Sequence, residues 1–259
     1  MKNKNAIFRM FILMAAVLII FNMNCARDME KKMTEELIQF LKNYEETVIP
    51  LSKELNLAYF KATTTGKEDL YKKMEELDVK LSKVYANKED FARLKKIKES
   101  NAITDPILIR QLDLIFNAYL SKQIDEKKLE EMIKIGAGIE KKFATYRAEI
   151  AGKKFTDNEI EEILKKSSDS EELKNAWMAS KQVGKIVEED VLKLVRLRNE
   201  AAQELGFPNY QVMHLKLTDH NPEEIESLFD ELDQLTRETF LNLKSEIDEF
   251  LAKGYDIEV

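Results

Sequence analysis

Residues 221–254, NPEEIESLFDELDQLTRETFLNLKSEIDEFLAKG, have the sequence of one long amphipathic helix and decide the fold class. Asn221 and Pro222 are residue types favoured at the N-cap and at the first position of a helix. Apolar residues then recur on one helical face, namely Ile225, Leu228, Phe229, Leu232, Leu235, Phe240, Leu243, Ile247 and Phe250. The alternatives for this face are an exposed coiled-coil seam and burial inside a large domain. Because the spacing drifts from strict heptads, we expect burial, and we expect the helix to end at Gly254.

The chain upstream of this helix shows the same periodicity. It predicts helices from Met33 to a stop before Pro50, through residues 70–84, from an Asp105 cap with Pro106 beside it, and through residues 129–150 up to Gly152. Two capping boxes, Thr156 with Glu159 and Ser168 with Glu171, predict further helices, the second continuing through Trp177 to Leu205 before Gly206 and Pro208. No strand-like alternation occurs upstream of Tyr255, so the predicted fold is one all-α unit of long amphipathic helices, with an extended element beginning at residues 255–259.

Composition supports this fold class and excludes several others. The 259 residues are 44% hydrophobic, which is too apolar for a disordered chain, and only 7 Gly and 4 Pro interrupt them. A single cysteine excludes a disulfide scaffold. The formal net charge of −7 argues against nucleic acid as a partner, because phosphate binding needs a basic surface.

The first residues have the layout of a bacterial secretory signal. Positive charges at Lys2, Lys4 and Arg9 precede an apolar run over residues 10–21, and we interpret residues 1–24 as a signal peptide of the lipoprotein type. The lone Cys25 that follows resembles a lipobox cysteine and is the predicted lipid attachment site, although Asn22 and Asn24 depart from the usual lipobox residues. An uncleaved anchor helix and an ordinary secretory signal are the alternatives. The expected location is outside a bacterial cell membrane, anchored to it and facing the periplasm or the exterior.

Motifs for catalysis or metal binding are missing from the sequence. His214 and His220 are six residues apart and belong to no HExxH or ExxH pair, so we expect surface or half-buried polar roles for both. The Gly-Ala-Gly of residues 136–138 lacks the continuation of a phosphate loop and predicts close helix packing or a kink. We therefore predict no catalytic residue, no metal ligand and no cofactor within this chain.

Two other features have ordinary structural interpretations. Adjacent acidic pairs are expected on the solvated faces of amphipathic helices, and they are Glu45-Glu46, Glu75-Glu76, Glu130-Glu131, Glu161-Glu162 and Glu188-Glu189. Trp177 follows the apolar rhythm of its helix, which favours a place in the core over a role in stacking on a ligand.

Three stretches resemble a known family when they are taken together and in order. They are residues 176–184 (AWMASKQVG), 194–210 (LVRLRNEAAQELGFPNY) and 228–237 (LFDELDQLTR). Their sequences are similar to bacterial peptidases related to angiotensin-converting enzyme, and a looser collinear likeness begins at about Met33.

The resemblance implies a nearly all-helical zinc metallopeptidase that removes dipeptides from peptide C-termini. In this family two lobes enclose a deep channel, N-terminal helices form a lid, and zinc is held by the two histidines of HExxH and a downstream glutamate. None of these ligands is present, so residues 25–259 look like the lid and the first half of the scaffold, truncated at the C-terminus. Zinc and peptide substrates would belong to the complete enzyme.

Three interpretations of such a chain follow. The first, which we favour, is the N-terminal piece of a peptidase whose gene is split, prematurely stopped or incompletely recorded. The second is a folded, non-catalytic helical lipoprotein that binds a peptide or a protein. In the third, a separately encoded catalytic half docks onto this chain and rebuilds the enzyme.

Overall fold

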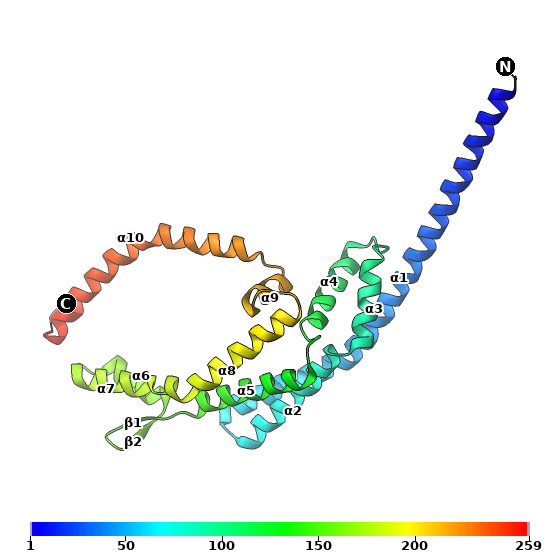
Figure 1. Cartoon of the computed structure of the whole chain (residues 1–259). Helices are drawn as coiled ribbons and strands as arrows, with labels where there is room; N and C mark the ends of the chain where they lie inside the picture. Colours follow the sequence, from blue (N-terminus) through cyan, green and yellow to red (C-terminus); the bar gives the residue numbers. More distant parts are fainter. Residues whose placement is uncertain (1, 258–259) are drawn as a thin grey trace. The chain divides into compact units, whose positions relative to one another are not determined.

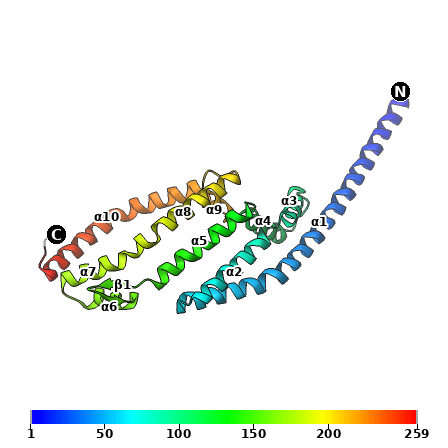
Figure 2. The same cartoon turned by 60° about the horizontal axis from the view of Figure 1, so that its bottom comes forward.

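The computed structural model describes residues 2–257, and it describes side-chain surroundings from residue 27 onward. The described chain is almost entirely helical, which confirms the all-α prediction (Figures 1 and 2). Its elements are α1 (Lys2–Thr65), α2 (Glu68–Tyr85), α3 (Lys88–Glu99), α4 (Pro106–Leu120), α5 (Glu126–Thr145), β1 (Ala148–Ile150), β2 (Lys153–Phe155), α6 (Asp157–Lys166), α7 (Ser170–Lys181), α8 (Val183–Glu204), α9 (Tyr210–Leu217) and α10 (Pro222–Tyr255).

The described chain divides into two compact units. Unit 1 holds the chain up to Lys53 together with Leu81–Gln123, and unit 2 holds Glu54–Lys80 and the chain from Ile124 onward. The helices α1 and α2 each contribute residues to both units. Because α1 and α2 run across the division between the units without interruption, the sequence shows no linker that would mark it.

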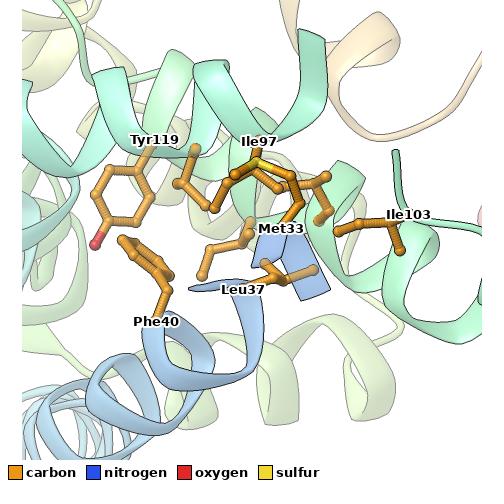
Figure 3. Close-up of a cluster of buried hydrophobic side chains, with 9 residues drawn as sticks. Met33, Leu37, Phe40, Ile97, Ile103 and Tyr119 are labelled. Carbon is orange, nitrogen blue, oxygen red and sulfur yellow. The ribbon is translucent and has the colours of Figure 1, made fainter. Parts of the chain in front are cut away.

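The core of unit 1 joins α1 to the consecutive helices α3 and α4. The buried residues come from α1, α3, the loop after α3, and α4, and they are Met33, Leu37, Phe40, Leu94, Ile97, Ile103, Leu112, Ile115 and Tyr119 (Figure 3). The ring of Tyr119 meets that of Phe40 edge to face, with 5.9 Å between centroids, a favoured geometry for aromatic pairs. Beside this core, the Arg93 guanidinium donates to the Glu36 carboxylate over 3.2 Å and fastens α3 to α1.

Helix α1 continues through Pro50, which corrects the predicted stop before that residue. A proline inside a helix removes the hydrogen bond to the carbonyl four residues earlier, here that of Glu46. Both Pro50 and Glu46 are exposed, so water reaches this carbonyl, while Val48 and Leu51 on either side are buried. Burial of the flanking residues thus outweighs the local cost of proline.

Helix α5 ends at Thr145, and the predicted helix through Ile150 is wrong. Residues 148–155 instead form an antiparallel hairpin in which Ala148 pairs with Phe155 and Ile150 with Lys153. Its turn uses Ala151 and Gly152, both with positive φ, the conformation that glycine adopts most readily. The prediction of Gly152 as the C-cap of this helix is therefore wrong, because Gly152 lies in the turn of the hairpin.

A small second core forms where this hairpin packs against α6 and α7. Its fully buried members are Ala148, Ile160 and Ala176. The Tyr146 hydroxyl donates to the Ala179 carbonyl over 2.6 Å and joins the hairpin to α7. The capping box predicted for Thr156 and Glu159 is confirmed at the start of α6.

The helix starts and stops were predicted with mixed success. Asp105 and Asn221 cap α4 and α10 as expected, each with proline following. The predicted Ser168 box is wrong, because the Asp169 side chain accepts the hydrogen bonds at the start of α7. The predicted long helix is also divided at Gln182 into α7 and α8.

Helix α10 is exposed along its length, and the prediction of a buried helix is wrong. Ala252 is its one buried residue among those described. The helix extends one residue beyond Gly254 to Tyr255, and Asp256 follows with φ of 52° in the left-handed region. The extended element predicted for residues 255–259 does not begin at Tyr255, which is helical, and residues 258 and 259 lie outside the described residues.

Candidate functional site

Unit 2 carries a large exposed apolar surface on α7, α8 and α10. We call its α10 part the α10 stripe, composed of Leu228, Phe229, Leu232, Leu235, Phe240, Leu243, Ile247 and Phe250, all exposed. Phe250 is 76% exposed and Leu235 is 70% exposed, values that single scattered surface residues reach in many proteins. A row of this length on one helix differs from scattered residues, because contiguous apolar patches mark surfaces that another partner covers.

Helix α8 packs against α5 on one side, and this packing fixes the orientation of its exposed apolar side. Val187, Leu194 and Ala201 are buried on the side that packs against α5. Lys128 of α5 pairs with Glu200 of α8 over 3.4 Å, and it also pairs with Glu204. Since α8 is anchored on this side, its large exposed apolar residues face outward, and they are Ile186, Val191, Leu192 and Val195.

Trp177 belongs to this exposed surface, so its predicted place in the core is wrong. Its side chain is 51% exposed on α7, next to the exposed Met178. The Lys181 ammonium lies 5.7 Å from the indole ring centroid, within range of a cation–π contact. The small Ala176, not Trp177, fills the core position of this turn.

Two of the acidic pairs meet in a cleft between α2 and α5 of about 480 Å³. Glu75 and Glu76 line it from α2, and Glu130 and Glu131 line it from α5, together with Val79, Lys127 and Lys134. Glu131 is already paired with Lys193 over 2.6 Å. The lysines neutralise much of the acidic charge, so this cleft has the character of a solvated ion-pair surface rather than of a pair of catalytic carboxylates.

The described residues do not fit a zinc site. Nowhere among them do three His, Cys, Asp or Glu side chains gather as metal ligands would. His214 is exposed and stacks on Tyr210, with 6.0 Å between ring centroids. His220 is also exposed, and its Nδ1 lies 3.2 Å from the Thr218 hydroxyl. The surface roles expected for both histidines are confirmed.

Three further predictions concern the lipid attachment site at Cys25, the N-terminal segment and the glycines of residues 136–138. The Cys25 side chain and the side chains of residues 1–24 lie outside the described residues. In the described part of the chain, no helix combines the length and the apolar character needed to cross a membrane. Gly136 and Gly138 lie inside α5 with open space where a Cβ would stand, so close helix packing does not explain them.

A buried tyrosine in unit 2 lacks a hydrogen-bond partner. Tyr71 of α2 is 4% exposed, and its hydroxyl makes no hydrogen bond among the described residues. Burial raises the pKa of Tyr71, and the neighbouring Glu140 adds to the increase. Burial also raises the pKa of the Glu140 carboxyl, with a further contribution from Asp78.

We predict that Tyr71→Phe leaves the free energy of unfolding unchanged or raises it by about 1 kcal/mol, because it removes a buried hydroxyl that has no partner. Tyr146→Phe is the matched variant in the same unit. It should lower the free energy of unfolding by about 1 kcal/mol, since it removes the hydrogen bond to the Ala179 carbonyl, which then accepts only from the Gln182 backbone N–H. Urea unfolding followed by circular dichroism measures both, and a clear loss of stability in Tyr71→Phe would show that its hydroxyl has a partner.

Comparison with known proteins gives one match that covers most of the chain. The sequence model of the family described as angiotensin-converting enzyme, a peptidase family, matches residues 31–256. This range covers parts of both units, and it contains α7, α8 and α10 up to Tyr255. The comparison with curated proteins gives no match.

Proposed function

This chain belongs to the angiotensin-converting enzyme family of peptidases, and from that premise we propose that it supplies the N-terminal lid and scaffold helices of a zinc-dependent peptidyl-dipeptidase-like metallopeptidase. The family match over residues 31–256 is the observation that carries the proposal. The chemistry is hydrolysis of a peptide bond, and the substrates are peptides that lose a C-terminal dipeptide.

The zinc and its ligands come from another part of the enzyme in this proposal. The described residues offer no group of ligands for the metal, and the sequence has no HExxH motif. The exposed apolar surface of α7, α8 and α10 is the kind of surface that a further part of the same enzyme covers. That part can be continuous with this chain or separately encoded.

The lid role is assigned to the helices of unit 1. These helices bury a core of their own, which includes Leu37, Leu94 and Tyr119, each at most 1% exposed. A unit with its own core keeps its structure while it moves, as a lid over a channel requires. Unit 2, with its exposed apolar surface, is the scaffold in this proposal.

Anchoring at the membrane is a further part of the proposal. The apolar run of residues 10–21 and the lone Cys25 support an exported lipoprotein that is attached through that cysteine. The enzyme would then act on peptides in the periplasm or outside the cell.

The second candidate function is a non-catalytic helical module that binds a peptide or a protein. The same exposed apolar surface favours it, because such a surface also serves as a docking site. The two candidates differ in their dependence on a catalytic part. The module would work alone, whereas the peptidase scaffold would need its partner.

We predict that the purified chain binds no zinc above the background of surface carboxylates and releases no dipeptide from a test peptide. The reason is the lack of suitably grouped ligands among the described residues. Equilibrium dialysis against zinc and chromatographic detection of C-terminal dipeptides measure these two properties. Binding of one zinc ion per chain together with chelator-sensitive release would contradict the proposal.

A further inference from the structure

We propose that the α10 stripe is a docking surface for an amphipathic helical segment whose apolar face is bordered by lysine or arginine. The inference deepens the proposed function, since it specifies the chemistry of the part that covers α10. It rests on the apolar exposure of α10 and on the distribution of charge along it, and it needs no peptidase activity for its test.

The first observation is that α10 lacks a partner along its apolar side. Within the described chain its main contacts are with the short neighbouring helix α9. Figure 1 shows α10 running on from α9 and standing apart from α8 along its length. A surface helix that stands alone with a wide apolar face is marginal in water, so its stability depends on what covers that face.

The second observation is the charge of α10. Residues 222–255 contain ten Asp and Glu and three Lys and Arg, a formal charge of −7. Two of the three cations are already used within the helix, because Arg237 pairs with Asp233 and Lys244 with Asp248. The helix therefore carries a surplus of negative charge that its own cations leave uncompensated.

Part of that negative charge lies along the edge of the α10 stripe. Glu224, Glu231 and Glu238 follow one another at intervals of seven residues. Glu231 is three residues after Leu228 and four before Leu235, so it neighbours both on the helix surface. All three glutamates are exposed, and their carboxylates have no ion-pair partner within 4.0 Å among the described residues. They are positioned to meet cations on a helix that covers the stripe.

Charge also favours a basic helical segment over the other partners that could cover the α10 stripe. A second copy of α10 would bring two helices of −7 together, which opposes pairing. The exposed face of α8 offers no surplus of cations, because α8 has five acidic and four basic residues. An anionic membrane surface is repelled by the same charge.

The test uses the full chain and two synthetic helical peptides of equal length, one built from leucine and lysine and the other from leucine and glutamate. Fluorescence anisotropy measures the binding of each labelled peptide. We expect the leucine–lysine peptide to bind at least about tenfold more tightly than the leucine–glutamate peptide, with an affinity that falls as salt rises.

Variants locate the binding to α10. Leu235→Ala should weaken binding of the leucine–lysine peptide about tenfold, since it truncates a central member of the stripe. Glu231→Lys should weaken it about fivefold, whereas its matched control Asp230→Lys, which changes the charge equally on the polar face of the helix, should change it less than about twofold. Circular dichroism confirms that each variant keeps its helix content.

Several outcomes would overturn the inference. Equal binding of both peptides, or equal effects of Glu231→Lys and Asp230→Lys, would show that the charge along the stripe does not select the partner. Self-association of the chain that Leu235→Ala abolishes would make a second copy the occupant. Should a catalytic part restore peptidase activity while the leucine–lysine peptide fails to bind, the proposed function would stand and only the basic partner would be rejected.

Discussion

Replacing Leu94 with alanine is expected to lower the free energy of unfolding of unit 1 by about 3–4 kcal/mol. Leu94 has no exposed surface, and it joins α3 to the core that also contains Leu37 of α1 and Ile115 of α4. Truncation to alanine removes buried methyl groups and leaves a cavity that these helices fill only in part. Urea unfolding followed by circular dichroism measures the change.

Leu114→Ala is the matched control in the same unit. Leu114 of α4 is 47% exposed and lies outside the core, so its truncation should change the free energy of unfolding by about 0.5 kcal/mol or less. Similar losses of stability in the two variants would show that the packing in Figure 3 is not the main source of stability in unit 1.

Exchange of Leu228, Leu235 and Phe240 for glutamine is expected to leave the free energy of unfolding within about 1 kcal/mol of its original value. All three are exposed on α10, and glutamine is at least as good a helix former as the residues that it replaces. The exchange removes three apolar side chains from the α10 stripe, so binding of the neutral dye Nile red should fall by about half or more.

The control for this exchange is Leu194→Gln on α8. Leu194 is 7% exposed on the side of α8 that packs against α5, and a buried amide there should cost about 3 kcal/mol or more. A comparable loss of stability in the triple α10 variant would mean that α10 is packed in solution, contrary to the exposed helix described above.

Local signals in the sequence predicted the helical class and several helix starts. Asp105, Thr156 and Asn221 were identified as caps because their side chains satisfy backbone amides within three residues of themselves. Such interactions are encoded in a few neighbouring residues, and no distant contact is needed to recognise them.

The errors occurred where distant contacts decide the outcome. Helix α1 passes Pro50 because its flanking residues are buried by other elements. The hairpin at residues 148–155 replaces the end of a predicted helix because Ala148 packs against α6 and α7. Neither effect is visible in the local pattern of apolar residues.

The candidate site was predicted only in part. The family resemblance drew on residues 176–184, 194–210 and 228–237, and these overlap α7, α8 and α10, which carry the exposed apolar surface. The apolar pattern of α10 predicted burial, because periodicity shows which residues share a face but not what covers that face. Only the arrangement of neighbouring elements shows that the α10 stripe is left uncovered by the described chain.

We propose that this chain supplies the lid and scaffold of a family peptidase whose zinc ligands lie elsewhere. The most direct test mixes the purified chain with a separately produced catalytic part that carries HExxH and the downstream glutamate, and measures dipeptide release from a synthetic peptide. We predict no release by either part alone and chelator-sensitive release by the mixture. Chelator-sensitive release by this chain alone, or an inactive mixture in which the two parts form a stable complex, would contradict the proposed lid and scaffold role.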